Sequence, residues 1–301
     1  MARKRDIVIG VVIVGAFLMV FGFMGIMFIG VMTGDGDAGF SSLGGGSIGV
    51  IPMFGVMDEY SCRPVIDYVD RWAENNSIKA IVIHINSPGG GTAISQELHD
   101  AIKRASQEKP VVAAMSEVAA SGGYYIACAA DRIVANPGTL TGSIGTIMSF
   151  TTYEGLMDKI GIGSETIKSG EFKDVGNYSR QMTDKEELML QAVVMDGYEQ
   201  FVEAVAEGRG MDREEVYNIA DGSLFTGLQA YNLGLVDTLG GLTQAIELAE
   251  DMAEIERDSR IVTPRQRRES VWTDLLTGVL GGLGKQIGAS NDGPKLMYLY
   301  R

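Results

Sequence analysis

Two glycine-rich turns hold the residues best suited to bind or attack a carbonyl group. The first, residues 87–91, reads Ser-Pro-Gly-Gly-Gly directly after an apolar run, so its backbone N–H groups are free to face a phosphate or a developing oxyanion. The second, residues 119–124, sets Ser121 among small residues, as in the strand-to-helix turn of a nucleophile elbow, although the G-x-S-x-G spelling is only loosely met. Each turn alone also fits a structural role. Together they favour a serine nucleophile.

A serine nucleophile needs a base, and the two histidines are poorly placed to supply it. His84 lies in a buried-looking strand and His99 on a predicted helix, positions that suit packing or surface roles. A neutral lysine is the alternative. An unperturbed lysine, with a pKa of ~10.4, is neutral in roughly one molecule in 2,500 at pH 7, but burial lowers that pKa by up to ~3–5 units. Lys168 and Lys173 both follow a predicted short strand, and their spacing does not choose between them.

The elements that must position these residues alternate between strand and helix. We expect strands at 48–53, 78–86, 110–115 and 132–135, with helices at 64–74, 93–105 and 122–130 between them. The strand at 78–86 is apolar on both faces, as a buried parallel strand should be. This order predicts an α/β domain with a mostly parallel sheet and crossover helices. A capping box at Thr183 and Glu186 opens a helix that ends near Gly208 and Gly210, and shorter helices are expected near 211–220, 226–232 and 241–254.

Composition excludes several classes of function. The formal charge of −14 argues against nucleic acid as a partner, because phosphate binding needs a basic face. Two cysteines rule out a disulfide scaffold, and two histidines cannot supply a three-histidine metal site. The sequence also has no phosphate-binding G-x-x-x-x-G-K-[ST] loop. We therefore expect neither a metal nor a nucleotide cofactor.

The N-terminus predicts a membrane anchor. Residues 7–32 carry no charge and, as a helix of about 39 Å, would cross a ~30 Å hydrocarbon core. Arg3, Lys4 and Arg5 precede the run, which places residues 1–6 in the cytoplasm and everything after about residue 33 outside. A cleaved signal peptide is disfavoured, since the run is too long and lacks an A-x-A-like site. Residues 33–47 read as a Gly/Ser linker, residues 48–254 as the folded domain and residues 255–301 as a C-terminal tail.

The two cysteines would lie in an oxidising exterior. Cys62 and Cys128 could pair there. Cys128, however, follows the start of a helix built from small residues and is expected to be a small core residue instead.

Five ordered segments together resemble the SppA-type signal peptide peptidases, which are membrane-anchored Ser/Lys proteases of the Clp protease–crotonase fold. The segments are INSPGGG (85–91), SEVAASGGYYIACAAD (116–131), GTLTGSIGT (138–146), IKSGEFKD (167–174) and a set of matches across 208–237. The resemblance implies Ser121 as nucleophile, Lys173 rather than Lys168 as general base, and Ser143 as the residue that orients the lysine. It also implies an oxyanion hole formed by the N–H of Gly122 and that of Gly89 or Gly90.

The resemblance carries further expectations. Clp-type relatives use a histidine about 25 residues after the serine, but position 146 is threonine and no histidine follows His99, so a Ser-His-Asp version is excluded. A homo-oligomeric ring is implied, each subunit supplying only part of the site. The tail, which ends Lys-Leu-Met-Tyr-Leu-Tyr-Arg, is expected to lie in the substrate groove of its own or a neighbouring subunit, with an unstructured tail or an oligomer contact as the alternative.

The expected function is therefore an anchored endopeptidase that degrades signal peptide remnants or similar apolar peptides outside the cytoplasm. A protease of the same fold that acts on one membrane protein partner is the main alternative. A crotonase-type acyl-CoA enzyme is disfavoured, because coenzyme A is a cytosolic ligand. A non-catalytic membrane scaffold would not need Ser121, Ser143 and Lys173 together.

Overall fold

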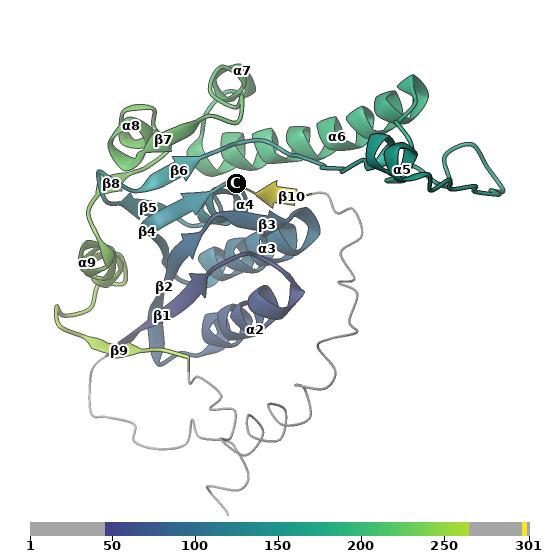
Figure 1. Cartoon of the computed structure of the whole chain (residues 1–301). Coiled ribbons are helices and arrows are strands. Elements are labelled where there is room, and N and C mark those ends of the chain that lie inside the picture. The colour runs from purple at the N-terminus through teal and green to yellow at the C-terminus, as the bar shows by residue number, and fades with distance from the viewer. Residues whose placement is uncertain (1–45, 265–296, 300–301) are drawn as a thin grey trace, which may run out of the picture. The chain divides into compact units, whose positions relative to one another are not determined.

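The computed structural model describes residues 46–264 and 297–299, and its centre is a mostly parallel sheet (Figure 1). In chain order the strands of this sheet are β1 Ser47–Phe54, β2 Ile78–Ser87, β4 Val111–Ala120, β5 Arg132–Ala135, β6 Leu140–Gly142, β7 Leu224–Thr226, β8 Thr238–Leu239 and β9 Arg260–Val262. Their order is β7-β6-β4-β2-β1-β9, with β5 beside β4 and β8 beside β5. Every described pairing in the sheet is parallel except β6 with β7. The predicted α/β class is confirmed.

Two short strands form a separate ribbon next to this sheet. Strand β3 (Gly89–Gly91) lies in the first glycine-rich turn and pairs antiparallel with β10 (Met297–Leu299), near the C-terminus. The helices are α2 Glu59–Glu74, α3 Thr92–Glu108, α4 Gly122–Ala127, α5 Glu154–Ile160, α6 Asp184–Arg209, α7 Arg213–Tyr217, α8 Gly227–Asn232 and α9 Leu242–Met252.

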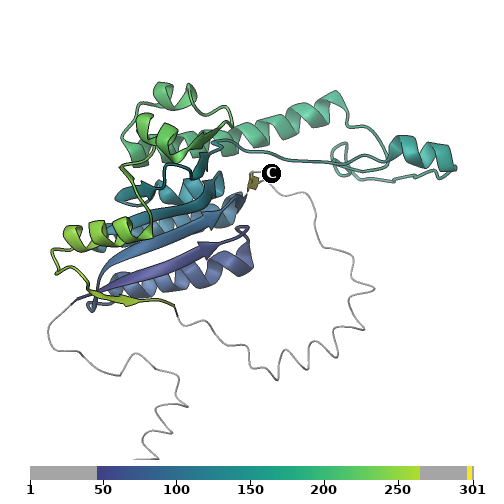
Figure 2. The ribbon, with the colours of Figure 1, turned by 60° about the vertical axis from the view of Figure 1, so that its left-hand side comes forward.

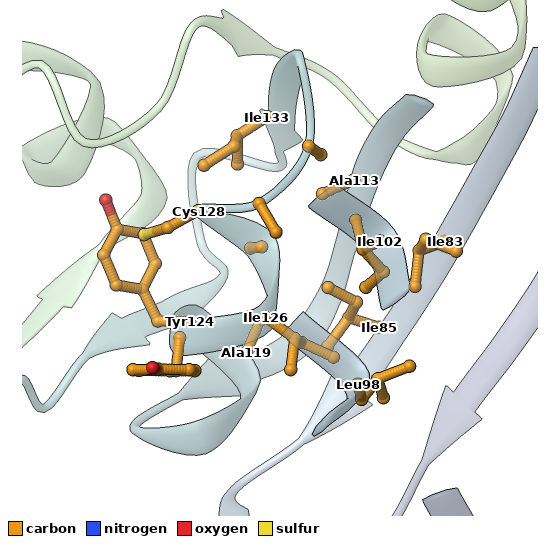
Figure 3. Close-up of a cluster of buried hydrophobic side chains, with 14 of the residues drawn as sticks. Ile83, Ile85, Leu98, Ile102, Ala113, Ala119, Tyr124, Ile126, Cys128 and Ile133 are labelled. Carbon is orange, nitrogen blue, oxygen red and sulfur yellow. The ribbon is translucent and has the colours of Figure 1, made fainter. Parts of the chain in front are cut away.

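Both faces of β2 are buried, as its sequence predicts. Ile83 and Ile85 point to the face covered by α3, where they meet Leu98 and Ile102 (Figure 3). Val82 points to the opposite face, in the cluster that contains the buried alanines of α9. At about 25 cal/mol per Å² of apolar surface removed from water, burial on both faces stabilises β2 as a central strand of the sheet.

Two element boundaries differ from the prediction. Helix α2 begins at Glu59 and not at the predicted start, Pro64. Asp58 and Ser61 form a capping box there, in which the Ser61 N–H donates to Asp58 Oδ1 over 2.8 Å. Strand β4 runs five residues past the predicted end, to Ala120, because its last residues pair with β6, Val118 opposite Leu140. Such a distant pairing has no local sequence signal.

The helices predicted for the second half are present, as α6, α7, α8 and α9. Helix α6 begins after the capping box of Thr183 and Glu186 and ends at Gly210, whose φ of 61° is left-handed. Residues 147–183, here called the arm, connect β6 to α6 and include α5, which has no buried residue. In both views α5 and the start of α6 lie beyond the edge of the sheet (Figures 1 and 2).

The predicted anchor, residues 7–32, lies outside the described residues. Among residues 46–264 no helix is both long and apolar enough to span a bilayer. Cys62 and Cys128 are both free and buried, which confirms the expectation that Cys128 is a core residue. Burial raises the pKa of the Cys62 thiol to about 11 and that of Cys128 to about 12.

Candidate active site

Three neighbouring parallel strands end at the same edge of the sheet, and the candidate residues follow them directly. Ser87 of β2 is opposite Ala119 of β4, and Ala120 is opposite Gly142 of β6. The chain then continues into the glycine turn 88–91, into Ser121 and into Ser143. Ligands of open α/β sheets bind at the carboxyl ends of the strands. The two glycine-rich turns and Ser143 therefore lie at one edge of the sheet.

Ser121 has the backbone of a nucleophile elbow. It separates β4 from α4 with φ 53° and ψ −119°, a conformation that costs an L-residue roughly 1–3 kcal/mol. The turn is held on both sides, because the Ser121 N–H donates to the Gly142 carbonyl over 2.8 Å and the Ser121 carbonyl accepts from the Tyr125 N–H over 2.8 Å. The residue is 1% exposed. A strained serine at a strand–turn–helix junction indicates a positioned hydroxyl.

Glycine at position 122 permits a close approach of two backbones. A Cβ there would lie 3.2 Å from both Gly89 Cα and Gly90 N, and 2.8 Å from Ser95 Oγ. The first residue of α4 therefore packs directly on β3. Since the first N–H groups of a helix have no partner within the helix, the Gly122 N–H is a donor at this junction.

The hydrogen bonds of β3 distinguish Gly89 from Gly90. The Met57 N–H donates to the Gly89 carbonyl over 2.9 Å, and the Gly91 N–H donates to the Met57 carbonyl over 2.8 Å. The Gly89 N–H donates to Ser87 Oγ over 3.1 Å. Because successive residues of a strand face opposite sides, the N–H of Gly90 faces away from Met57. That is the side on which β10 lies, with Tyr298 opposite Gly90.

Ser143 lies next to this junction. It follows β6 with a φ of 49°, and its N–H donates to the Ser223 carbonyl over 2.7 Å. The hydrogen bond from the Ser121 N–H to the carbonyl of Gly142, the residue before Ser143, joins the two turns. The structure thus brings together Ser121, Gly122, β3 and Ser143.

The structure does not bring Lys173 to this cluster within one copy of the chain. Lys173 lies in the part of the arm between α5 and α6, its side chain is exposed, and no described group accepts a hydrogen bond from its Nζ. The predicted short strand before the two lysines is wrong, since residues 162–168 have no neighbouring strand with which to pair. Lys168 Nζ donates to Asp174 Oδ1 over 2.6 Å.

Arg180 binds two carboxylates beside Lys173, a feature that the sequence reasoning missed. Its guanidinium donates to Asp174 on one side and to Glu186 on the other. The Arg180 guanidinium is the main cause that lowers the pKa of both carboxyls, that of Glu186 to about 2. The only sequence signal was the charge pattern, two acidic residues each six positions from an arginine.

Neither histidine is in the turns at the carboxyl edge, in accord with the expectation. His84 lies on β2 with its ring edge-on to Phe54, the ring centroids 5.0 Å apart. His99 lies on α3 against Tyr125. Burial lowers the pKa of both imidazoles, so both are neutral near pH 7.

Comparison with known proteins decides the family. A sequence model described as peptidase family S49 matches residues 103–256, half of the chain. The chain belongs to peptidase family S49. A Clp protease model matches residues 55–139, in agreement with the predicted Clp-like α/β fold. The expected resemblance to SppA-type peptidases is confirmed, and the chain is a member of a serine protease family.

Relatives of this S49 chain extend over much of its length. A protein of Synechocystis provisionally named a protease is 42% identical over 188 residues, which is 62% of this chain and 68% of the relative. A second provisionally named protease, from Methanocaldococcus jannaschii, is 35% identical over 75% of this chain and 72% of its own length. The chloroplastic serine protease SPPA of Arabidopsis thaliana is 34% identical over 85% of this chain but only 38% of its own length.

Proposed function

We propose that this S49 peptidase is a membrane-anchored serine endopeptidase that uses Ser121 and Lys173 to degrade signal peptide remnants or similar apolar peptides. The observation that carries the proposal is the backbone of Ser121, held at φ 53° between the carboxyl edge of the sheet and the N-terminus of α4. A strained turn of this kind holds a serine Oγ at the position where a substrate carbonyl would bind next to backbone N–H donors.

The reaction is an acyl transfer in two steps. The neutral amine of Lys173 takes the proton of the Ser121 hydroxyl as Oγ attacks the peptide carbonyl. The N–H groups of Gly122 and Gly90 donate to the tetrahedral oxyanion, and the lysine ammonium then protonates the leaving amine. Water, deprotonated by the same amine, attacks the acyl carbonyl, and the resulting ammonium returns the proton to Ser121 Oγ as the ester bond breaks. Ser143, beside Ser121, orients the lysine.

The base comes from a neighbouring copy of the chain in this proposal. Lys173 lies on the arm and has no hydrogen bond to Ser121 or Ser143 among the described residues. The arm also exposes large apolar side chains that a neighbouring subunit would cover; they are Leu156, Ile160, Ile162 and Ile167. In a closed ring every arm contacts the site of a neighbouring copy, because each copy both receives and supplies a lysine.

An extended peptide would bind as a strand added to β3. Strand β10 pairs antiparallel with β3, and its sequence, Met-Tyr-Leu, has the apolar character proposed for the substrate. This pairing supports both the groove and the proposal that the tail occupies it until substrate arrives. Deleting residues 291–301 should therefore raise the rate of peptide cleavage. An unchanged or lower rate in an intact oligomer would contradict this role of the tail.

Anchoring and location belong to the same proposal. The uncharged run 7–32, preceded by Arg3, Lys4 and Arg5, supports a single span with the peptidase domain outside the cytoplasm. A protease added to intact cells stripped of their wall should reach the domain. Digestion only after the membrane is opened would contradict the orientation.

The test of the function is cleavage of a fluorogenic apolar peptide by the full chain in detergent. Ser121→Ala and Lys173→Ala should each abolish cleavage without changing folding or oligomeric state, whereas Lys168→Ala should retain it. Mixing the two inactive variants should restore on the order of a quarter of the activity, since a site then needs its serine and its lysine from different copies. Activity in Lys173→Ala would refute the dyad, and failure of the mixture would refute the shared site.

The same assay separates the two substrate classes. If the protein cleaves short apolar peptides, it is the proposed degradative enzyme. If it cleaves none of them, even after residues 291–301 are deleted, it acts instead on a specific protein partner.

A further inference from the structure

The segment that carries Lys173 is fixed by charges and not by an apolar core. Helix α5 buries no residue, and the two large apolar side chains nearest the lysines, Ile167 and Phe172, are 98% and 41% exposed. The less exposed side chains around the lysines are instead acidic and basic. The side chain of Glu186 is 1% exposed, that of Asp174 11% and that of Arg180 27%. Carboxylates this buried are found where they are paired.

Arg180 is the centre of this cluster and uses both edges of its guanidinium. Its Nη1 and Nη2 donate to the two carboxylate oxygens of Glu186 over 2.8 and 2.5 Å. Its Nε and Nη2 donate to the two oxygens of Asp174 over 3.1 and 2.8 Å. Two-point pairing fixes orientation as well as distance, which a lysine cannot do.

The two carboxylates lie on parts of the chain with different secondary structure. Glu186 is in the first turn of α6, where it also accepts from the Thr183 N–H over 2.9 Å and completes the capping box. Asp174 lies in the irregular segment and is the residue directly after Lys173. Arg180 therefore ties the backbone of Lys173 to the start of a 26-residue helix.

The same cluster separates the roles of the two lysines. Lys168 Nζ donates to Asp174 Oδ1 over 2.6 Å and to the Glu171 carbonyl over 2.9 Å, so its ammonium is held as a structural cation. Lys173 has no acceptor among the described groups and remains available to a neighbouring site. With two cations, Lys168 and Arg180, against two carboxylates, the cluster is electrically balanced.

We propose that Arg180 is the positioning residue of the catalytic lysine: by joining Asp174 to Glu186 it holds the backbone of Lys173 at the place from which its amine reaches Ser121 of the next copy. This inference rests on the proposed function. A displacement of about 1 Å at a reacting group costs on the order of 10²-fold in rate, so loss of the clamp should appear in kcat.

The test compares Arg180→Ala with Arg180→Lys and a matched control. The control is Lys185→Ala, which removes a cation from the same region but only an exposed pair with Glu171. We expect kcat to fall about 10²-fold in Arg180→Ala and at least about tenfold in Arg180→Lys, with KM within about threefold. Lys185→Ala should keep wild-type kcat. All variants should keep the oligomeric state, and the stability lost in Arg180→Ala, which leaves Asp174 and Glu186 without their partner, should be confined to the arm and the first turn of α6.

A second readout does not depend on peptidase activity. In the Ser121→Ala background, digestion by the lysine-specific protease Lys-C should cut after Lys173 at least about tenfold faster when Arg180 is alanine, and at the unchanged rate in Lys185→Ala. Wild-type kcat in Arg180→Ala, equal losses in Lys185→Ala, or an unchanged Lys-C rate would each overturn the inference. If the wild type cleaves no peptide, the proposed function fails, while the Lys-C comparison still decides whether Arg180 orders the segment.

Discussion

A methyl group at position 122 should disable the oxyanion site while leaving the fold in place. In Gly122→Ala the new Cβ would lie 3.2 Å from Gly89 Cα and Gly90 N, so β3 has to move away by a few tenths of an ångström. Ser95 Oγ, 2.8 Å from the same Cβ, is buried and donates to the Gly91 carbonyl over 2.7 Å, so it cannot turn aside without losing that bond. The strain is therefore transmitted to β3.

The size of the effect follows from the narrow range over which such donors work. Oxyanion donors act at about 2.7–3.1 Å, and loss of one donor costs about 10²–10³-fold in kcat. A shift of a few tenths of an ångström that separates the N–H of Gly90 from that of Gly122 should cost on the order of 10²-fold, or about 2.7 kcal/mol of transition-state stabilisation. KM should change by less than about threefold, because the ground-state carbonyl does not use the site fully.

The assay is steady-state cleavage of the apolar fluorogenic peptide, with Gly145→Ala as the control. Gly145 lies two residues past Ser143, but a Cβ there meets only Gly222, its Cα at 3.7 Å and its N at 4.0 Å, which are ordinary contacts. Gly145→Ala should therefore keep kcat within about twofold. A wild-type kcat in Gly122→Ala would refute the oxyanion assignment. Equal losses in both variants would show that the edge of the sheet responds to any added methyl group.

Three further predictions concern stability and titration. The side chain of Arg209 is 7% exposed and donates to both carboxylate oxygens of Asp237. Asp237→Ala removes this partner and should lower the free energy of unfolding in urea by about 3 kcal/mol. A loss below about 1 kcal/mol would contradict the pairing. Because burial raises their pKa values, Cys62 and Cys128 should react with a disulfide reagent at pH 8 only after denaturation, and rapid reaction of the native protein would contradict their burial. The pKa of Glu186 is lowered from its usual ~4.3 to about 2, so its carboxylate stabilises the start of α6 above pH ~4.3, and that stability is lost as the pH falls towards about 2. Hydrogen exchange of residues 174–187, corrected for its intrinsic pH dependence, should follow this window, and Glu186→Gln should reduce the pH dependence to the part that Asp174 contributes, since its pKa is lowered by the same guanidinium.

Local patterns in the sequence predicted much of the fold. The two-sided apolar pattern of 78–86 identified a central strand, and the Thr183–Glu186 capping box identified the first turn of α6. The strand-to-helix position of Ser121 was also visible, because small residues follow an apolar run there. Each of these signals depends on interactions within a few residues, which is the range over which sequence patterns are informative.

Pairings between distant segments were not visible. The glycines at 89–91 read as a turn, yet they form a strand because Met57 on one side and β10 on the other supply partners. The clamp around Arg180 joins side chains from an irregular segment to a helix, and neither has a periodic pattern that predicts the contact. Register and side-chain pairing of this kind are set by the tertiary fold.

The left-handed backbone of Ser121 has a consequence for how such a chain can lose its activity. Glycine adopts a positive φ without the penalty that serine pays there, so Ser121→Gly should fold at least as stably as the wild type while lacking a nucleophile. This one substitution would therefore end catalysis without lowering the stability of the folded protein. Random mutation meets no folding barrier on this route, and inactive descendants would persist as intact, well-folded proteins. A normal melting temperature therefore does not show that the nucleophile at position 121 is present.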